Sequence, residues 1–228
     1  MRRHLWTEVL IVALIGILPD LHRAFSTVLH PELRSLETPS SYLFGSLIVR
    51  AISVTAPVLY LIWRNKEKFS DFGIKKFAFL SDTALGTGLY IASYFAFVII
   101  GMITVSLFPT VVQEASENAY YFPTHPEHLI GVLVFIVGVV LNSIAEEIVM
   151  RGYFIERLEY LLGSTAKSIL LSSFLFALYH AYQGIIGTFN ILLFGILYGV
   201  FYSRFRNIWP LVVAHSIQNF ITFTSLMR

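Results

Sequence analysis

The chain has 228 residues, of which 56% are hydrophobic and 13% are charged, with a mean hydropathy of +0.72. A soluble domain typically carries charge on about 25% of its residues, and one of this length could not bury so much apolar surface, so lipid must cover part of it. The net charge of +2 argues against a nucleic-acid partner. The absence of cysteine excludes disulfides, a thiol nucleophile and cysteine metal ligands.

Apolar stretches of the length of a membrane span recur along the whole chain. A spanning helix needs roughly 20 mostly apolar residues. The first stretch is the weakest because it is short and contains Glu8, and the second contains Arg50, which must snorkel, pair or face protein. The sequence therefore predicts an all-α fold, a polytopic bundle of about seven (six to eight) transmembrane helices forming a single integral membrane domain over 1–228. The seven expected spans are 5–19, 41–63, 83–108, 129–150, 166–183, 186–203 and 208–226.

The distribution of basic residues predicts the orientation. With the N-terminus in the cytoplasm, twelve Lys and Arg residues lie inside and three, Arg23, Arg34 and Arg228, lie outside, which follows the positive-inside rule. The expected outer loop 109–128 has no Lys or Arg and contains several glutamates. We expect a multi-pass protein of the cell (plasma) membrane, with the lipid bilayer as its partner and a cytoplasmic N-terminus.

A small set of polar residues lies where the chain should be inside the membrane. Each ionisable group there costs at least a few kcal/mol on insertion scales and calls for a functional reason. Glu146 and Glu147 close the fourth predicted span, and Arg151 follows four residues after Glu147. Among the seven histidines, His180 and His215 are the two that fall within predicted spans. The deep polar set is completed by Asn142, Asn190, Gln218 and Asn219.

Helix geometry indicates that these residues can meet. If the fourth span continues as a helix and stops at Gly163, the following helix returns antiparallel to it. At a rise of roughly 1.5 Å per residue, Glu146 and His180 then differ in height by only about 3 Å. Asn219 follows His215 at i+4, so both lie on one face of the last span. We therefore expect an active site inside the bundle.

The two glutamates must have different roles, because neighbouring residues on a helix point about 100° apart. Arg151 is well placed to pair with Glu147 at i+4. We expect Glu146 to be the general base on a water molecule, with Glu147 and Arg151 as an orienting pair. Geometry alone leaves the assignment between the two glutamates close to even.

The two histidines allow two kinds of chemistry. With Glu146 as an acidic ligand, His180 and His215 could bind Zn²⁺ as a catalytic metal. Alternatively, one histidine positions or deprotonates water while the other, with Asn219, stabilises an oxyanion without a cofactor. The H-E-x-x-H zinc spacing is absent, and the sequence leaves both readings open.

Three short motifs together resemble those of the CPBP family, which includes type II CAAX prenyl proteases and bacteriocin-processing, Abi-like proteins. The segment from Glu146 to Arg151 resembles its E-E-x-x-x-R motif, the segment from Phe176 to His180 its F-x-x-x-H motif, and His215-Ser-Ile-Gln-Asn219 its H-x-x-x-N motif. The motifs occur in the order of the family. The resemblance covers about 129–220, which we expect to be the catalytic core.

The resemblance implies an α-helical intramembrane endopeptidase of a bacterial or archaeal membrane that acts on a peptide or protein substrate. Leader, pheromone or bacteriocin peptides are expected rather than prenylated proteins. Members are described both as metalloproteases and as glutamate-dependent peptidases, so the resemblance does not decide the metal. The implied site consists of Glu146, Glu147, Arg151, His180, His215 and Asn219.

Two other functions are compatible with a polar cluster inside a membrane bundle. One is a non-enzymatic bacteriocin-immunity or regulatory protein that binds a peptide or a membrane partner. The other is a proton-coupled transporter, since buried Glu and His also build proton relays. The intact set of site residues argues against the first, and the absence of an inverted repeat in the sequence argues against the second.

Overall fold

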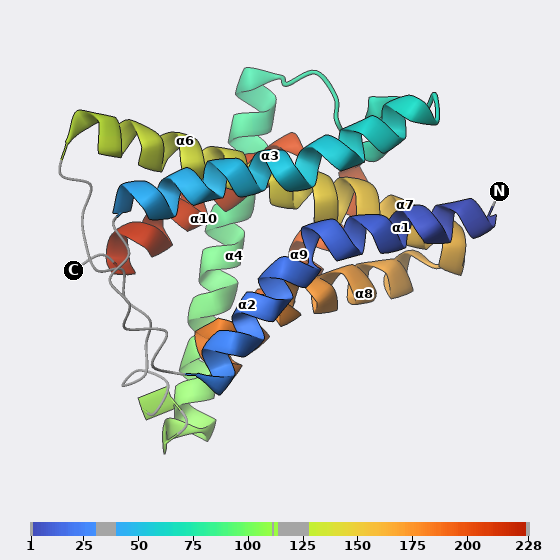
Figure 1. Ribbon diagram of the computed structural model, residues 1–228. Helices are drawn as coiled ribbons and strands as arrows, with labels where there is room; N and C mark the ends of the chain where they lie inside the picture. Colours follow the sequence, from blue (N-terminus) through green and yellow to red (C-terminus); the bar gives the residue numbers. More distant parts are fainter. Residues whose placement is uncertain (1, 31–39, 111, 114–127, 227–228) are drawn as a thin grey trace.

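The computed structural model describes residues 2–30, 40–110, 112–113 and 128–226 (Figure 1). All regular secondary structure in this part of the chain is helical, without a strand, as the sequence predicts. The glutamates expected in the outer loop, Glu114, Glu117 and Glu127, and the basic residues Arg34 and Arg228 fall outside the described residues. The helices are α1 (Arg2–Gly16), α2 (Leu18–Leu29), α3 (Ser40–Arg64), η2 (Phe69–Phe72), α4 (Phe79–Leu107), α6 (Leu129–Glu146), η3 (Glu147–Ile155), α7 (Glu156–Leu162), α8 (Thr165–Leu178), η4 (Ala181–Gln183), α9 (Gly184–Phe205) and α10 (Trp209–Leu226).

Helices α6, η3 and α7 form one uninterrupted stretch of 34 residues, Leu129–Leu162. Its central part, η3, is π-helical. The stretch ends at Gly163, whose φ of 65° is left-handed, a conformation that glycine adopts without the steric cost of a Cβ. Ser164 then caps α8, its side chain accepting a hydrogen bond from the backbone N–H of Lys167. The predicted continuation of the fourth span and its stop at Gly163 are confirmed.

Helices α3 and α6 lie along each other and run in the same direction (Figure 1). A Cβ on Gly138 of α6 would come within 2.7 Å of the carbonyl oxygen of Phe44 in α3. The absence of a side chain at Gly138 therefore permits the close approach of the two helices. This approach aligns Arg50, further along α3, with Glu146 at the end of α6.

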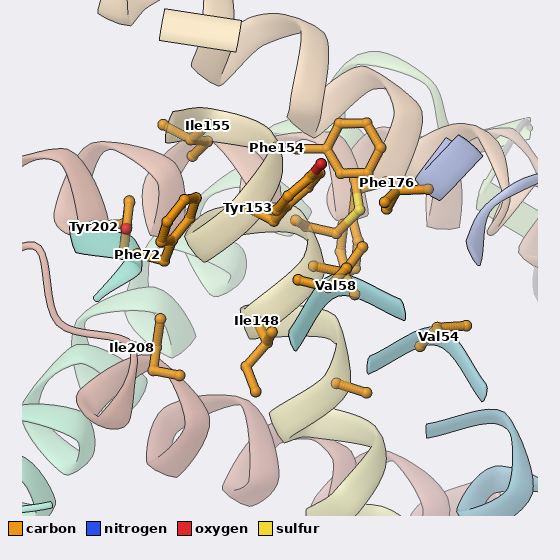
Figure 2. Packing of buried hydrophobic residues seen from close by; sticks show 14 of the residues in the cluster. Val54, Val58, Phe72, Ile148, Tyr153, Phe154, Ile155, Phe176, Tyr202 and Ile208 are labelled. Atoms are coloured by element: carbon orange, nitrogen blue, oxygen red, sulfur yellow. The ribbon is translucent and has the colours of Figure 1, made fainter. Parts of the chain in front are cut away.

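The main core surrounds η3 (Figure 2). Tyr153, Phe154 and Ile155 are each at most 1% exposed, and the ring of Tyr153 stacks on that of Phe72 from η2 with centroids 6.1 Å apart. On α3, Val58 is fully buried against the same cluster. The segment that carries Glu147 and Arg151 is thus deeply buried in the core.

Helix α4 crosses the other helices steeply (Figure 1). It exposes many large apolar side chains. Phe95, Ile99 and Met102 are more than half exposed. Exposed apolar area of this extent is a membrane-facing or interaction surface in a folded protein. Together with its apolar helices, it marks the chain as a membrane protein.

The expected number of seven spans is not confirmed. Four helices in the described residues are long and apolar enough to cross a membrane, or five if the pair α1 and α2, bent by 44°, forms one span. The expected span 166–183 contains α8, which has only 14 residues. The expected span 208–226 corresponds to α10, whose mean hydropathy is lowered by His215, Gln218 and Asn219. The four helices are Tyr42–Arg64, Phe79–Leu107, Leu129–Leu162 and Ala181–Phe205.

Candidate active site

The two glutamates lie at the junction where the α-helix becomes a π-helix. Glu146 is the last residue of α6 and Glu147 the first residue of η3. Both are buried, Glu146 at 5% exposure and Glu147 at 0%. π-helical turns are rare and occur frequently at functional sites. The change from α-helix to π-helix and the two buried carboxylates therefore lie at the same point of the chain.

His215 of α10 lies between the two carboxylates. Its Nδ1 is 2.7 Å from Oε1 of Glu147, and its Nε2 is 3.4 Å from Oε2 of Glu146. Because a carboxylate only accepts hydrogen bonds, Nδ1 of His215 carries the proton in the contact with Glu147. The orientation of the imidazole is thus set by Glu147, and its other nitrogen faces Glu146.

Glu147 is in turn paired with Arg151, as the spacing predicts. Nη1 of Arg151 is 3.2 Å from Oε1 of Glu147, and the two side chains are 2% and 0% exposed. The guanidinium carbon lies 4.5 Å from the ring centre of Phe176 and 5.7 Å from that of Phe194, in the range of cation–π contacts. This buried pair provides a rigid support behind His215.

Glu146 has a partner that the sequence motifs do not include. Arg50 of α3 places Nη1 3.3 Å from Oε1 of Glu146, and the same nitrogen donates to the side-chain oxygen of Asn142 at 2.8 Å. Nε of Arg50 is 2.6 Å from Oδ2 of Asp20 in α2. The sequence singled out Arg50, because a basic residue inside a span must snorkel, pair or face protein. It did not indicate that the partners are Asp20, Asn142 and Glu146.

His180 does not lie within a helix, contrary to the prediction. Helix α8 ends at Leu178, and His180 lies in the turn before η4, with φ −100° and ψ 10°. Its Nδ1 contacts the carbonyl oxygen of Phe176 at 2.8 Å. A carbonyl only accepts, so Nδ1 donates and Nε2 of the neutral ring is an acceptor. His180 is close enough to Glu146 for an electrostatic interaction, whereas His215 makes the direct contact with this glutamate.

A cavity of about 450 Å³ lies beside these residues. His180, His215 and Asn219 line it together, and the amide nitrogen of Asn219 donates to the hydroxyl of Ser143 at 3.2 Å. No Asp, Glu, Lys or Arg of the described chain lines the cavity. The remaining lining residues are apolar, aromatic or uncharged polar: Tyr94, Phe97, Val98, Phe176, Gln183, Gly187, Asn190, Ile191, Phe194, Gln218 and Thr222.

The expected zinc ligands are not arranged as a metal site. In residues 2–30, 40–110, 112–113 and 128–226, no three His, Asp or Glu side chains are grouped so that they could hold a metal ion. Both ring nitrogens of His215 face carboxylates instead, and Nδ1 of His180 is bound to the backbone. This donor set does not fit the zinc alternative of Glu146, His180 and His215.

The structure thus brings five of the six expected residues together. Glu146 and Glu147 contact His215, and His180 and Asn219 line the cavity with His215. The sixth, Arg151, supports this group through Glu147. Residues 128–221 match the family of type II CAAX prenyl endopeptidase Rce1-like proteins. The match contains every one of the expected site residues and leaves out α1 to α4. No curated protein and no solved structure matches the chain.

Proposed function

We propose that this chain hydrolyses peptide bonds with a water molecule activated by Glu146. Residues 128–221 match the type II CAAX prenyl endopeptidase Rce1-like family, which supports a peptidase. The observation that carries this mechanism is the position of His215 between Glu146 and Glu147. A histidine held by one carboxylate and facing a second is an arrangement suited to general acid–base chemistry.

The attack on the peptide begins with a proton transfer from water to Glu146. Glu146 is the better base because Oε2 faces the cavity-lining His215, while Glu147 is committed to His215 and Arg151. Nε2 of His180, an acceptor, orients the water from the other side. The water oxygen bonds to the carbonyl carbon as its proton moves to Glu146.

The charge that develops on the carbonyl oxygen is stabilised by His215 and Asn219. One N–H of the Asn219 amide is used by Ser143, and the second is available to the oxyanion. With both ring nitrogens protonated, His215 donates a hydrogen bond to the oxyanion from Nε2. When the C–N bond breaks, Glu146 returns its proton to the leaving amine, so that protons balance and the products are a carboxylate and an amine.

The cavity lining indicates the kind of peptide segment that fits. Apolar and aromatic side chains, with the amides of Asn190 and Gln218, surround the space next to His215. This lining suits an uncharged segment whose backbone N–H and C=O groups need partners away from water. Membrane-associated leader or pheromone peptides meet this description. We place the protein in the cell membrane with its N-terminus in the cytoplasm.

The test is cleavage of a panel of fluorogenic peptides by the purified full-length protein in detergent. Glu146→Gln is compared with the native chain and with Glu159→Gln, a matched loss of a carboxylate on the same continuous helix, where Glu159 pairs with Arg206 outside the cavity. We expect Glu146→Gln to abolish cleavage and Glu159→Gln to retain it. A chelator is added in a parallel set and is expected to leave the rate unchanged.

Full cleavage by Glu146→Gln would contradict the proposed base. Loss of cleavage with chelator, restored by added zinc, would contradict the metal-free mechanism and keep the peptidase. A binding or immunity protein would instead show no cleavage of any peptide and full biological activity with Glu146→Gln.

A further inference from the structure

We propose that Arg50, held in place by Asp20, is a positioning residue that aims the Glu146 carboxylate at the water. This inference rests on the proposed role of Glu146 as the base. It extends the active site to helices α2 and α3, which lie outside the segment 128–221 that matches the peptidase family.

The contacts of Arg50 form a chain that ends on the base. Asp20 binds Nε of Arg50 at 2.6 Å, and Nη1 of Arg50 reaches the Glu146 carboxylate at 3.3 Å and the Asn142 side chain at 2.8 Å. The side chains of Arg50, Asp20 and Glu146 are 17%, 13% and 6% exposed. The guanidinium also lies 5.7 Å from the ring centre of Tyr179. Arg50 is therefore fixed on several sides.

The depth of Arg50 in its helix also indicates a functional role. Arg50 lies eight residues from the start of the span Tyr42–Arg64, which is roughly 12 Å along a helix. A charged residue at such a depth is costly and in membrane proteins is usually functional. Two carboxylates from two other helices offset this cost.

The two oxygens of Glu146 have different neighbours. Arg50 is on Oε1, and His215 is on Oε2. Holding Oε1 fixes the rotation of the carboxylate, so that Oε2 stays directed to His215, which lines the cavity. A displacement of about 1 Å in a reacting group can cost on the order of 100-fold in rate, and removal of Arg50 frees this rotation.

The Asp20 carboxylate acts on Glu146 indirectly, by holding Arg50 in place. Without it, Arg50 can turn between Asn142 and Glu146, since Nε loses its 2.6 Å partner. Asp20 is also 3.5 Å from Arg23, which is largely exposed and does not contact Glu146. Its effect on catalysis must therefore pass through Arg50.

The experiment measures kcat and KM of the full-length protein in detergent for Arg50→Gln, Arg50→Lys and Asp20→Asn. Arg64→Gln is the matched control, because Arg64 also lies on α3 and pairs with a carboxylate, Glu8 at 2.6 Å, away from the site. Each variant is first checked for a single size-exclusion peak and for its thermal midpoint.

For Arg50→Gln we expect kcat to fall roughly 10- to 100-fold with KM within about threefold of native, since the base and not the peptide site is disturbed. Arg50→Lys recovers most of kcat, because an ammonium group restores a cation next to Oε1. Asp20→Asn lowers kcat by less than Arg50→Gln does. The double variant Asp20→Asn/Arg50→Gln has the same kcat as Arg50→Gln alone, as expected for two groups that act in series. Arg64→Gln leaves kcat and KM unchanged.

A native kcat for Arg50→Gln, or an equal loss in Arg50→Gln and Arg50→Lys, would overturn the inference. If Arg50→Gln fails to fold, Asp20→Asn and Arg50→Lys decide it, and a native kcat in Asp20→Asn would contradict the chain of contacts. The variant Glu146→Gln separates a failure of the positioning role from a failure of the proposed base. If that variant is inactive while Arg50→Gln keeps full kcat, only the positioning role fails; if it is active, the proposed base and this inference fail together.

Discussion

Replacing Arg151 by methionine should destabilise the protein strongly while keeping the volume of the side chain similar. Arg151 is 2% exposed, and its partner Glu147 is fully buried. Removing one member of a buried ion pair leaves the other charge uncompensated, which typically costs about 3–5 kcal/mol. For chains of 150–250 residues, each kcal/mol lowers the thermal midpoint by roughly 2–4 °C, so we expect a decrease of roughly 6–20 °C.

The assay is thermal unfolding in detergent at one fixed heating rate, with native, Arg151→Met and the double variant Glu147→Gln/Arg151→Met side by side. Replacing both charges removes the buried unpaired group, so the double variant should regain much of the lost stability. Both should be inactive, because His215 loses its support. A midpoint within about 2 °C of native for Arg151→Met, or a double variant less stable than the single one, would refute the reasoning.

Two further substitutions test the packing and the oxyanion donor. Gly152→Ala would place a Cβ 2.7 Å from the carbonyl oxygen of Phe72, and overpacking of this kind costs about 1–3 kcal/mol of stability. In the control Gly88→Ala, the new Cβ meets no atom within 4 Å, so its thermal midpoint should equal or exceed that of the native chain. Equal midpoints for the two variants would contradict the packing at Gly152. Asn219→Ala should lower kcat by about 10²- to 10³-fold, as loss of an oxyanion donor does, with little change in thermal midpoint; a raised KM with native kcat would instead assign Asn219 to substrate binding.

The motif region was predictable because its residues interact over short and regular distances. The i+4 spacing of Glu147 and Arg151 fixed their pairing in advance, and Gly163 ended the helix as expected. The family resemblance implied that His215 shares a site with the glutamates, and the structure places it between them. The all-helical fold followed from composition and from the length of the apolar stretches.

The remaining features depend on contacts between helices that no local pattern encodes. The partners of Arg50 come from α2 and α6, at sequence distances of 30 and 92 residues, and the parallel approach of α3 and α6 decides them. His180 was expected in a helix because its neighbours are apolar, yet α8 ends two residues earlier. The expected count of seven spans is not confirmed, because an apolar stretch of the sequence does not show where its helix breaks.

The most direct test of the central claim is to follow the oxygen of the water into the product. The native chain and Glu146→Gln are incubated with a cleaved peptide in water enriched in heavy oxygen, and the fragments are analysed by mass spectrometry. The account predicts that the native chain forms a fragment with one heavy oxygen in its new carboxyl terminus and that Glu146→Gln forms no fragment. Equal amounts of labelled fragment from both proteins would contradict the role of Glu146 as the base that activates the water.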